Sequence, residues 1–253
     1  MAIDAACLTV GFLLVPDFAL MSYTAAIEPL RAANLLSEKT LYRWWHAAPS
    51  GEPVTASNGV AIIPDCGTRT ERGADIVFVC AGGNPATFDD RATFSWLRRL
   101  ARKGTVLGGI SGGSFLLARA GLLENRRATL HWEHLPAFRE AYPHVSVVPS
   151  LFEIDGNRIT CSGGISALDM MVALIEREHG RPDLGGVPPH PARAPARRAS
   201  RAGDGARRLP TADPLSRHRR VRDLGERPGR WRHGDGLRAD RRIDPRDREA
   251  RAG

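Results

Sequence analysis

Residues 105–119 have the sequence Thr105-Val-Leu-Gly-Gly-Ile-Ser-Gly-Gly-Ser-Phe-Leu-Leu-Ala-Arg119, which predicts a buried strand, a glycine-rich turn and the start of a helix. The apolar and β-branched residues Val106, Leu107 and Ile110 are typical of a strand that is covered on both faces. Glycines on both sides of Ser111 permit the sharp turn. We therefore expect Ser111 beside a helix N-terminus, where backbone N–H groups favour anions.

The segment Gly109-Ile-Ser-Gly-Gly113 also fits G-x-S-x-G, the pattern of the nucleophile elbow of hydrolases. A serine hydrolase is therefore the first hypothesis to test. The pattern is short, however, and the chain contains 26 glycines. The alternative is that Ser111 caps the helix that follows it and has no chemical role.

The two parts of the 253-residue chain differ in composition. Residues 1–180 contain 16 Lys and Arg against 18 Asp and Glu, a net charge of −2, whereas residues 181–253 contain 20 Arg against 10 acidic residues, a net charge of +10. The excess positive charge thus lies in the second part alone. The sequence pI of about 10.1 consequently does not indicate that the first part binds nucleic acid.

The four cysteines, Cys7, Cys66, Cys80 and Cys161, include no C-x-x-C pair, so the sequence predicts neither a disulfide framework nor a zinc site. Cys7, Cys80 and Cys161 lie in apolar runs, and we expect them to be small buried hydrophobes in a reducing compartment, the cytoplasm. Residues 1–14 lack the basic start of a signal peptide. No segment approaches the roughly 20 apolar residues that span a bilayer.

Apolar runs alternate with helical spacing along residues 8–180, which predicts an α/β fold. Four helices are predicted. The first covers residues 21–35 and closes near Asn34, and the second covers residues 92–103. The third follows Ser111 and ends at Gly121, and the fourth covers residues 166–179 and stops at Gly180. The predicted strands cover residues 8–15, 42–48, 60–63, 76–80, 106–110, 145–148, 152–155 and 158–161, and residues 128–132 are expected to be extended.

A second glycine turn, Ala81-Gly-Gly-Asn84, follows the predicted strand 76–80. Ligands of open α/β sheets bind outside the carboxyl ends of the strands. We therefore expect Gly82 and Gly83 to line one crevice with Gly112, although turn geometry alone is the alternative explanation.

A polar cluster, His131-Trp-Glu-His134, lies further along the chain. Its spacing matches no recognised metal motif and no cysteine accompanies it, so we predict neither a metal nor a cofactor.

Several segments together resemble the PfpI-type amidase-like domain, a relative of class I glutamine amidotransferases, in order and spacing over about residues 8–180. The resemblance implies a three-layer, flavodoxin-like α/β sandwich with a mostly parallel sheet. More narrowly, residues 28–34, 120–123, 127–132 and 151–155 resemble the sensor half of AraC-type transcription regulators. The segments that carry the broader resemblance are Phe12–Phe18, Glu28–Asn34, Cys80–Asn84, Gly109–Ala120, Cys161–Gly164 and Ala167–Asp169.

Catalytic members of that family carry a cysteine at the position of Ser111 and an acid at the position of Ser22, whereas the family's histidine is retained as His131. Two losses together favour ligand sensing over catalysis. The alternative is an amidase or hydrolase in which Ser111 is the nucleophile, His131 the base and Glu133 its orienting group. Against it, neighbouring side chains of a strand point to opposite faces, so we do not expect His131 and Glu133 to act together.

Among such regulators, the sequence resembles the branch that controls catabolism of quaternary-ammonium compounds such as betaine or carnitine. A ligand of that kind requires an aromatic face and a carboxylate for its cation, and backbone N–H groups for its carboxylate. The resemblance also implies a small-molecule effector, a homodimer and no membrane partner. The candidate ligand-binding residues are Glu28, Gly82, Gly83, Ser111, Gly112, His131, Trp132 and Glu133.

After Gly180 such a regulator would continue into helix-turn-helix units. Residues 181–253 contain no Lys, Phe, Tyr, Met, Asn, Gln or Cys and show no apolar periodicity. One interpretation is a disordered basic tail that contacts nucleic acid weakly through phosphates. The other, which we favour, is an out-of-frame segment in place of the DNA-binding domain, so that specific DNA contact would need a family C-terminal domain not recognisable here.

Overall fold

A computed structural model describes residues 7–180, which are built on a seven-stranded sheet of order β10-β11-β7-β6-β1-β2-β5. All neighbouring strands are parallel except β10 and β11, which form an antiparallel hairpin. The strands of this sheet are β1 (Leu8–Leu14), β2 (Tyr42–Ala48), β5 (Cys66–Gly67), β6 (Ile76–Ala81), β7 (Val106–Ser111), β10 (Phe152–Asp155) and β11 (Arg158–Cys161).

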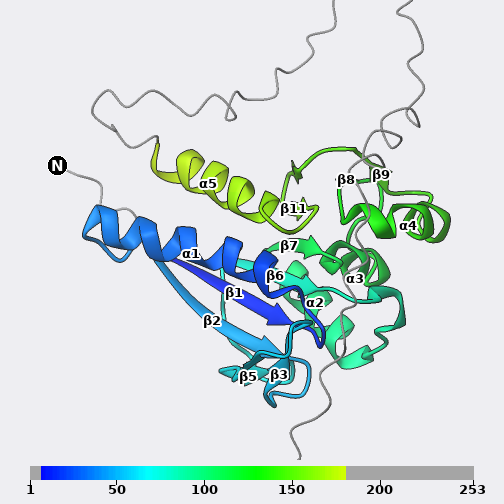
Figure 1. Cartoon of the computed structure of the whole chain (residues 1–253), viewed down its shortest axis with the longest axis horizontal. Helices are drawn as coiled ribbons and strands as arrows, with labels where there is room; N and C mark the ends of the chain where they lie inside the picture. The colour runs from blue at the N-terminus through cyan, green and yellow to red at the C-terminus, as the bar shows by residue number, and fades with distance from the viewer. Residues whose placement is uncertain (1–6, 181–253) are drawn as a thin grey trace, which may run out of the picture. The chain divides into compact units, whose positions relative to one another are not determined.

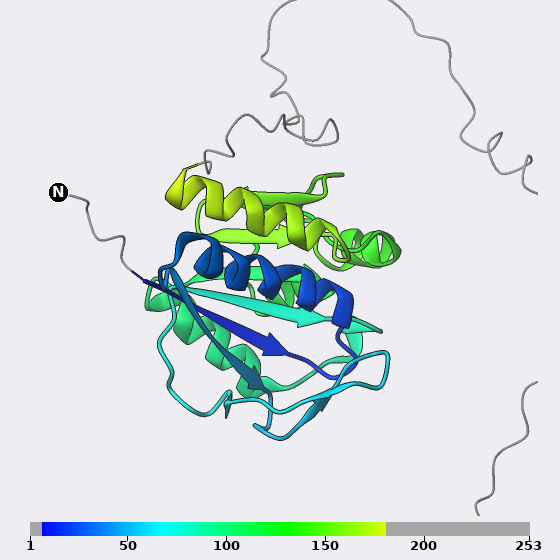
Figure 2. The same cartoon turned by 60° about the vertical axis from the view of Figure 1, so that its left-hand side comes forward.

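Helices cover both faces of the sheet. Figures 1 and 2 show α1 (Leu20–Ser37) and α5 (Ser166–His179) side by side over one face. The other face carries α2 (Arg91–Arg102) and α3 (Gly113–Arg119), and α4 (Leu135–Ala141) packs on α3. Each face has its own apolar core, which confirms the predicted three-layer, flavodoxin-like sandwich with a mostly parallel sheet.

The local sequence explains why α2 lies where it does. Its N-cap, Asp90, accepts hydrogen bonds from the backbone N–H groups of Ala92 and Thr93 at 3.2 Å. Phe94, Leu97 and Leu100 lie on one side of the helix, as the 3.6-residue period requires, and are buried in the core.

Several predicted boundaries were wrong. Residues 60–63 do not join the main sheet, because β4 (Ala61–Ile62) pairs with β3 (Val54–Thr55) in a separate antiparallel ribbon. Helix α1 continues beyond Asn34, whose side chain holds the backbone of Tyr42 through bonds of 2.8 and 2.9 Å instead of ending the helix.

The segment between α3 and β10 also differs from the prediction. Only β8 (Arg127–Ala128) and β9 (Ser146–Val147) are strands there, and they pair with each other in parallel. A short 3-10 turn, η2 (Trp132–His134), begins at the last residue of the segment 128–132 that was expected to be extended, and a further one, η1 (Pro85–Thr87), follows β6. Cys7 is exposed and not buried as predicted, because it precedes the first strand, whereas Cys80 and Cys161 are buried.

Among residues 7–180, no helix is both long enough and apolar enough to cross a membrane. Within the same range, no three His, Cys, Asp or Glu side chains gather as metal ligands would. The predictions for residues 181–253 lie outside the described residues.

Candidate functional site

The strand–turn–helix context of the G-x-S-x-G pattern is formed at the end of β7. Ser111 is 5% exposed and has a φ of +58°, in the left-handed region that non-glycine residues seldom adopt. It pairs with Ala81 of the parallel strand β6, so the two glycine turns lie next to each other at the carboxyl ends of the strands. Ser111 therefore has the backbone conformation of an elbow residue.

The elbow is packed tightly against the segment that leads into α5. A Cβ atom on Gly163 would lie only 2.6 Å from the Cβ atom of Ser111. Burial raises the pKa of the Cys161 thiol to about 11, against the lowering effect of hydrogen bonds from the backbone N–H groups of Gly163 and Ser111. The backbone N–H of Ser111 thus faces the Cys161 sulfur. No sequence spacing indicated this contact.

Ser22, at the position of the family's acid, contacts the same segment from the other side. Its side chain is buried, and its Oγ accepts a hydrogen bond of 2.7 Å from the backbone N–H of Gly164. The hydroxyl therefore ties the first turn of α1 to the Gly163-Gly164 turn. At the position where the resemblance implies a carboxylate, this chain therefore has a neutral hydroxyl, whose oxygen already accepts one hydrogen bond.

The predicted separation of His131 and Glu133 was wrong. Alternation separates consecutive residues of a strand, whereas residues two apart share a face. Here residues 132–134 form a 3-10 turn, and the Nδ1 atom of His131 lies 3.6 Å from the Oε2 atom of Glu133. The Trp132 indole lies beside the His131 ring, with centroids 5.7 Å apart, and is 69% exposed. Burial, followed by the nearby His131, lowers the pKa of His134.

In the described part of the chain no hydrogen bond joins Ser111 to His131. A serine nucleophile requires contact with a base, directly or through water. The structure thus contains the elbow and a His131–Glu133 pair, but not the link between them that a hydrolase needs.

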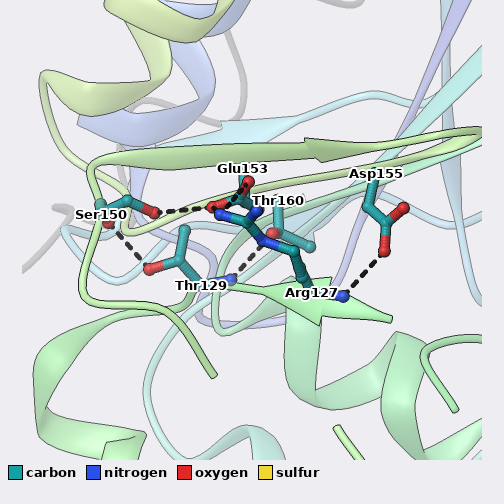
Figure 3. A network of polar contacts seen from close by, with 6 residues as sticks. All are labelled: Arg127, Thr129, Ser150, Glu153, Asp155 and Thr160. Atoms are coloured by element: carbon teal, nitrogen blue, oxygen red, sulfur yellow. Dashed lines mark hydrogen bonds and ion pairs between the residues drawn. The ribbon is translucent and has the colours of Figure 1, made fainter. Parts of the chain in front are cut away.

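Thr129 positions the segment that leads to His131. Its backbone N–H donates to Thr160 Oγ1 at 2.9 Å, and its hydroxyl donates to the Ser150 carbonyl at 2.8 Å (Figure 3). Its own carbonyl accepts from the buried Ser114 hydroxyl of α3 at 2.8 Å. These bonds hold the segment between α3 and β11, so that His131 follows a rigid stretch of backbone.

Figure 3 also shows two acidic side chains that hold the start of this segment. Glu153 lies 3.1 Å from the guanidinium of Arg127, and its carboxylate accepts from the Ser150 hydroxyl at 3.4 Å. Asp155 accepts a hydrogen bond of 2.8 Å from the backbone N–H of Arg127. No sequence spacing indicated this network, because its members come from three separate segments.

The predicted glycines are explained by packing within the chain. A Cβ atom on Gly82 would lie 2.5 Å from the Asp17 carbonyl oxygen. One on Gly112 would lie 3.0 Å from Pro85 Cγ, and the Gly112 N–H already donates to the Ala81 carbonyl. These contacts support the turn-geometry alternative, and the Gly112 N–H is not free to bind a ligand carboxylate.

Gly83 and Glu28 are each explained by their local structure. Gly83 has a φ of +54°, which explains glycine there by turn geometry. Glu28 lies on the exposed side of α1, where its carboxylate pairs with Arg31 at 2.7 Å. The candidate residues that keep exposed polar or aromatic groups in one cluster are therefore His131, Trp132 and Glu133.

A second polar array lies beside Ser22. The Tyr23 hydroxyl and the Nε2 atom of His46 are 2.7 Å apart, and the Nδ1 atom of His46 lies 3.4 Å from Asp65 Oδ2. Burial lowers the pKa of His46 and raises that of Tyr23. Sequence reasoning missed this array, since α1, β2 and the segment before β5 each contribute one residue without a common spacing.

The chain was compared with known proteins. Residues 9–177 match the family model described as "DJ-1/PfpI family". The HTH-type transcriptional regulator CdhR of Pseudomonas aeruginosa is 48% identical over 169 residues, covering 67% of this chain and 50% of the relative. The HTH-type transcriptional regulator GlxA of Rhizobium meliloti is 49% identical over 174 residues, covering 68% and 53%.

A solved structure of an AraC family transcriptional regulator from Pseudomonas putida superimposes with a TM-score of 0.63 at 26% identity, covering 68% of this chain and 93% of that one. This chain spans about half the length of the curated relatives it matches. Together with the elbow at Ser111 and the three-layer sheet, the match over residues 9–177 establishes that the chain belongs to the DJ-1/PfpI family.

Proposed function

We propose that residues 1–180 are the sensor domain of a transcription regulator and bind a small metabolite without transforming it. The support is the similarity to two HTH-type transcriptional regulators at 48% and 49% identity, which extends over nearly all of the described residues. We propose that the protein acts in the cytoplasm, where its effector would be a dissolved metabolite.

The residues at the family's catalytic positions support ligand binding rather than catalysis. Ser111 replaces the thiol, and Ser22 replaces the acid and is hydrogen-bonded to Gly164. Ser111 also has no hydrogen bond to His131 among the described residues, so nothing there removes its proton. The left-handed φ of Ser111 favours the hydrolase alternative, but it does not replace the missing base.

A quaternary-ammonium carboxylate such as betaine or carnitine is the effector that we propose. The exposed Trp132 indole offers an aromatic face to the cation, and the adjacent Glu133 carboxylate offers a negative charge. The hydroxyl of Ser111 and the ring of His131 are the groups that we assign to the ligand's carboxylate. We give Glu28 and the three glycines at most a supporting role.

We further propose that the domain forms homodimers. The side chains of Met21 and Ile165 are 61% and 64% exposed, and they flank the Ser22–Gly164 hydrogen bond. A second copy of the chain would remove this apolar surface from water. Specific DNA binding would require a C-terminal half such as the HTH-type relatives have.

Thermal unfolding of the full chain with a panel of glycine betaine, carnitine and amino acids tests the proposal. A ligand that binds only the folded state stabilises it by RT ln(1 + [L]/Kd), so the melting temperature rises with the logarithm of the ligand concentration once this exceeds Kd. We expect stabilisation by at least one quaternary-ammonium carboxylate, and its loss in Trp132→Ala but not in the control Trp44→Phe. No stabilisation by any compound would contradict the proposal.

A further inference from the structure

The outer edge of β2 is only partly covered. Strand β5 pairs with β2 at Ala47 and Ala48 alone. On the other side, the N–H of Leu8 donates to the Leu41 carbonyl at 2.9 Å, in the register Leu8 to Tyr42. Since alternate residues of a parallel strand bond to opposite neighbours, Tyr42, Trp44 and His46 direct their backbone groups away from β1.

Side chains cover two of these three positions. The backbone of Tyr42 is bonded on both sides by the amide of Asn34. The N–H of His46 donates to Asp65 Oδ2 at 2.7 Å, and its carbonyl accepts from the Asp65 N–H at 2.9 Å. Within residues 7–180, the N–H and carbonyl of Trp44 have no such partner on this edge, so one free donor and one free acceptor remain mid-strand.

An open, basic groove adjoins this edge. Its volume is about 430 Å³, and Arg72 and Gly73 also line a second groove of about 320 Å³ beneath α2. Arg43 in the first groove and Arg99 in the second have no ion-pair partner in the described part of the chain. The Arg72 guanidinium lies over the Trp45 ring. One of its nitrogen atoms is 3.6 Å from the Asp65 Oδ1 atom.

We propose that the edge of β2 at Trp44 accepts an extended acidic segment of a partner protein as an added strand. Main-chain bonds to Trp44 would align the segment, as in other additions to a sheet edge. Side chains alternate between faces along a strand. Acidic residues would therefore meet Arg43 and Arg72 on the α2 face, and apolar residues would meet the half-buried Trp44 side chain on the α1 face.

The charges and burial favour this occupant over three others. Residues 181–253 carry 20 Arg against 10 acids and would be repelled by the groove. A second copy paired through the same edge would bring like charges at Arg43 together. Single-stranded nucleic acid needs exposed aromatic faces, but Trp45 and Trp96 are each only 2% exposed.

The test uses the full chain and a fluorescein-labelled peptide of alternating Glu and Val, with a Lys–Val peptide as the charge control. Fluorescence anisotropy gives the affinity, and hydrogen exchange of residues 41–48 locates the site. We expect the acidic peptide to slow exchange in this segment. Arg43→Glu should weaken binding by roughly fivefold or more, whereas the matched change Arg91→Glu, exposed at the start of α2, should not.

Other outcomes overturn the proposal. Equal affinity in Arg43→Glu and the unchanged protein would mean that the arginines of residues 181–253 capture the peptide. Equal binding of the Lys–Val peptide would remove the charge argument. Protection of residues 41–48 by a single-stranded oligonucleotide but not by the peptide would assign the edge to nucleic acid. Protection by self-association alone would assign it to a second copy of the chain. If the acidic peptide did not bind at all, the proposed acidic partner would be excluded.

Discussion

The hydroxyl of Ser22 accepts a hydrogen bond of 2.7 Å from the backbone N–H of Gly164, which lies 142 positions later in the chain. Gly163, the neighbour of Gly164, in turn packs against Ser111. The two positions that carry an acid and a thiol in the catalytic relatives thus lie on either side of one glycine turn. In this chain the Ser22 hydroxyl is hydrogen-bonded to that turn.

Replacing Ser22 by alanine is expected to destabilise the fold by about 1–3 kcal/mol, because the Gly164 N–H would lose its partner in a poorly hydrated place. Chemical denaturation measures the loss. The exposed Ser57→Ala serves as the control and should change stability by less than about 0.5 kcal/mol. Equal stability of both variants would mean that water replaces the hydroxyl at Gly164.

Gly82→Ala tests whether the glycine turn serves packing. The added Cβ atom would lie 2.5 Å from the Asp17 carbonyl oxygen, so backbone must move, at a cost of about 1–3 kcal/mol. Gly73→Ala, whose Cβ atom would meet nothing within 4 Å, should be nearly neutral. A tolerated Gly82→Ala would argue that the glycine is needed for a ligand and not for packing.

Stability should fall as the pH is lowered through the range in which histidine titrates. Burial lowers the pKa of His46 in the folded protein below its ordinary value of 6.5, so the unfolded chain binds the proton more readily. The stabilisation is therefore complete above pH 6.5 and is lost as the pH falls through the folded-state pKa.

Denaturant unfolding at several pH values measures this slope. His46→Asn should flatten it, and His134→Asn should flatten it in part, because burial lowers the pKa of His134 as well. If the slope were unchanged in both variants, neither imidazole would be its source.

A serine-reactive phosphonate should not label the chain, because Ser111 lacks a base among the described residues. Mass spectrometry of the treated protein measures the adduct, and a known serine hydrolase provides the positive control. Labelling that disappears in Ser111→Ala would favour the hydrolase.

The full chain should not distinguish a promoter fragment from unrelated DNA in competition at moderate salt. Specific readout requires a rigid element held against base edges, whereas arginine-rich segments attract phosphates without sequence preference. Binding should also collapse as salt rises. A clear preference for the promoter would mean that residues 181–253 contain a reader, and resequencing codons 175–190 would separately test the out-of-frame interpretation.

The central strands β1, β6 and β7 could be predicted from the sequence because they are mostly apolar, whereas β5, at Cys66–Gly67, was missed because two residues show no pattern. The hairpin strands 152–155 and 158–161 and helix 166–179 have the predicted bounds. Helix α4 was missed because Phe138 is its only buried residue, so seven residues show no apolar face. The strand predicted at residues 60–63 is present as β4, but its pairing with β3 in a separate ribbon could not be predicted, since a short apolar run does not specify its partner.

The site was less predictable than the fold. The glycine-bracketed Ser111 has the expected elbow conformation, because local sequence determines that turn. The Ser22–Gly164 bond and the Tyr23–His46 pair depend on contacts between distant segments, and no spacing encodes them. The relation of His131 to Glu133 was mistaken because strand alternation was applied to residues two apart, which share a face of a strand.

The indole N–H signals of the full chain report whether the cluster around Trp132 binds an effector. The chain has five tryptophans, so single substitutions assign each signal. During titration with carnitine or glycine betaine, the Trp132 signal should move saturably while those of the buried Trp45 and Trp96 stay fixed, and the compound should be recovered unchanged. An unmoved Trp132 signal with both compounds, or conversion of either compound by the protein, would rule out a non-catalytic effector site at Trp132.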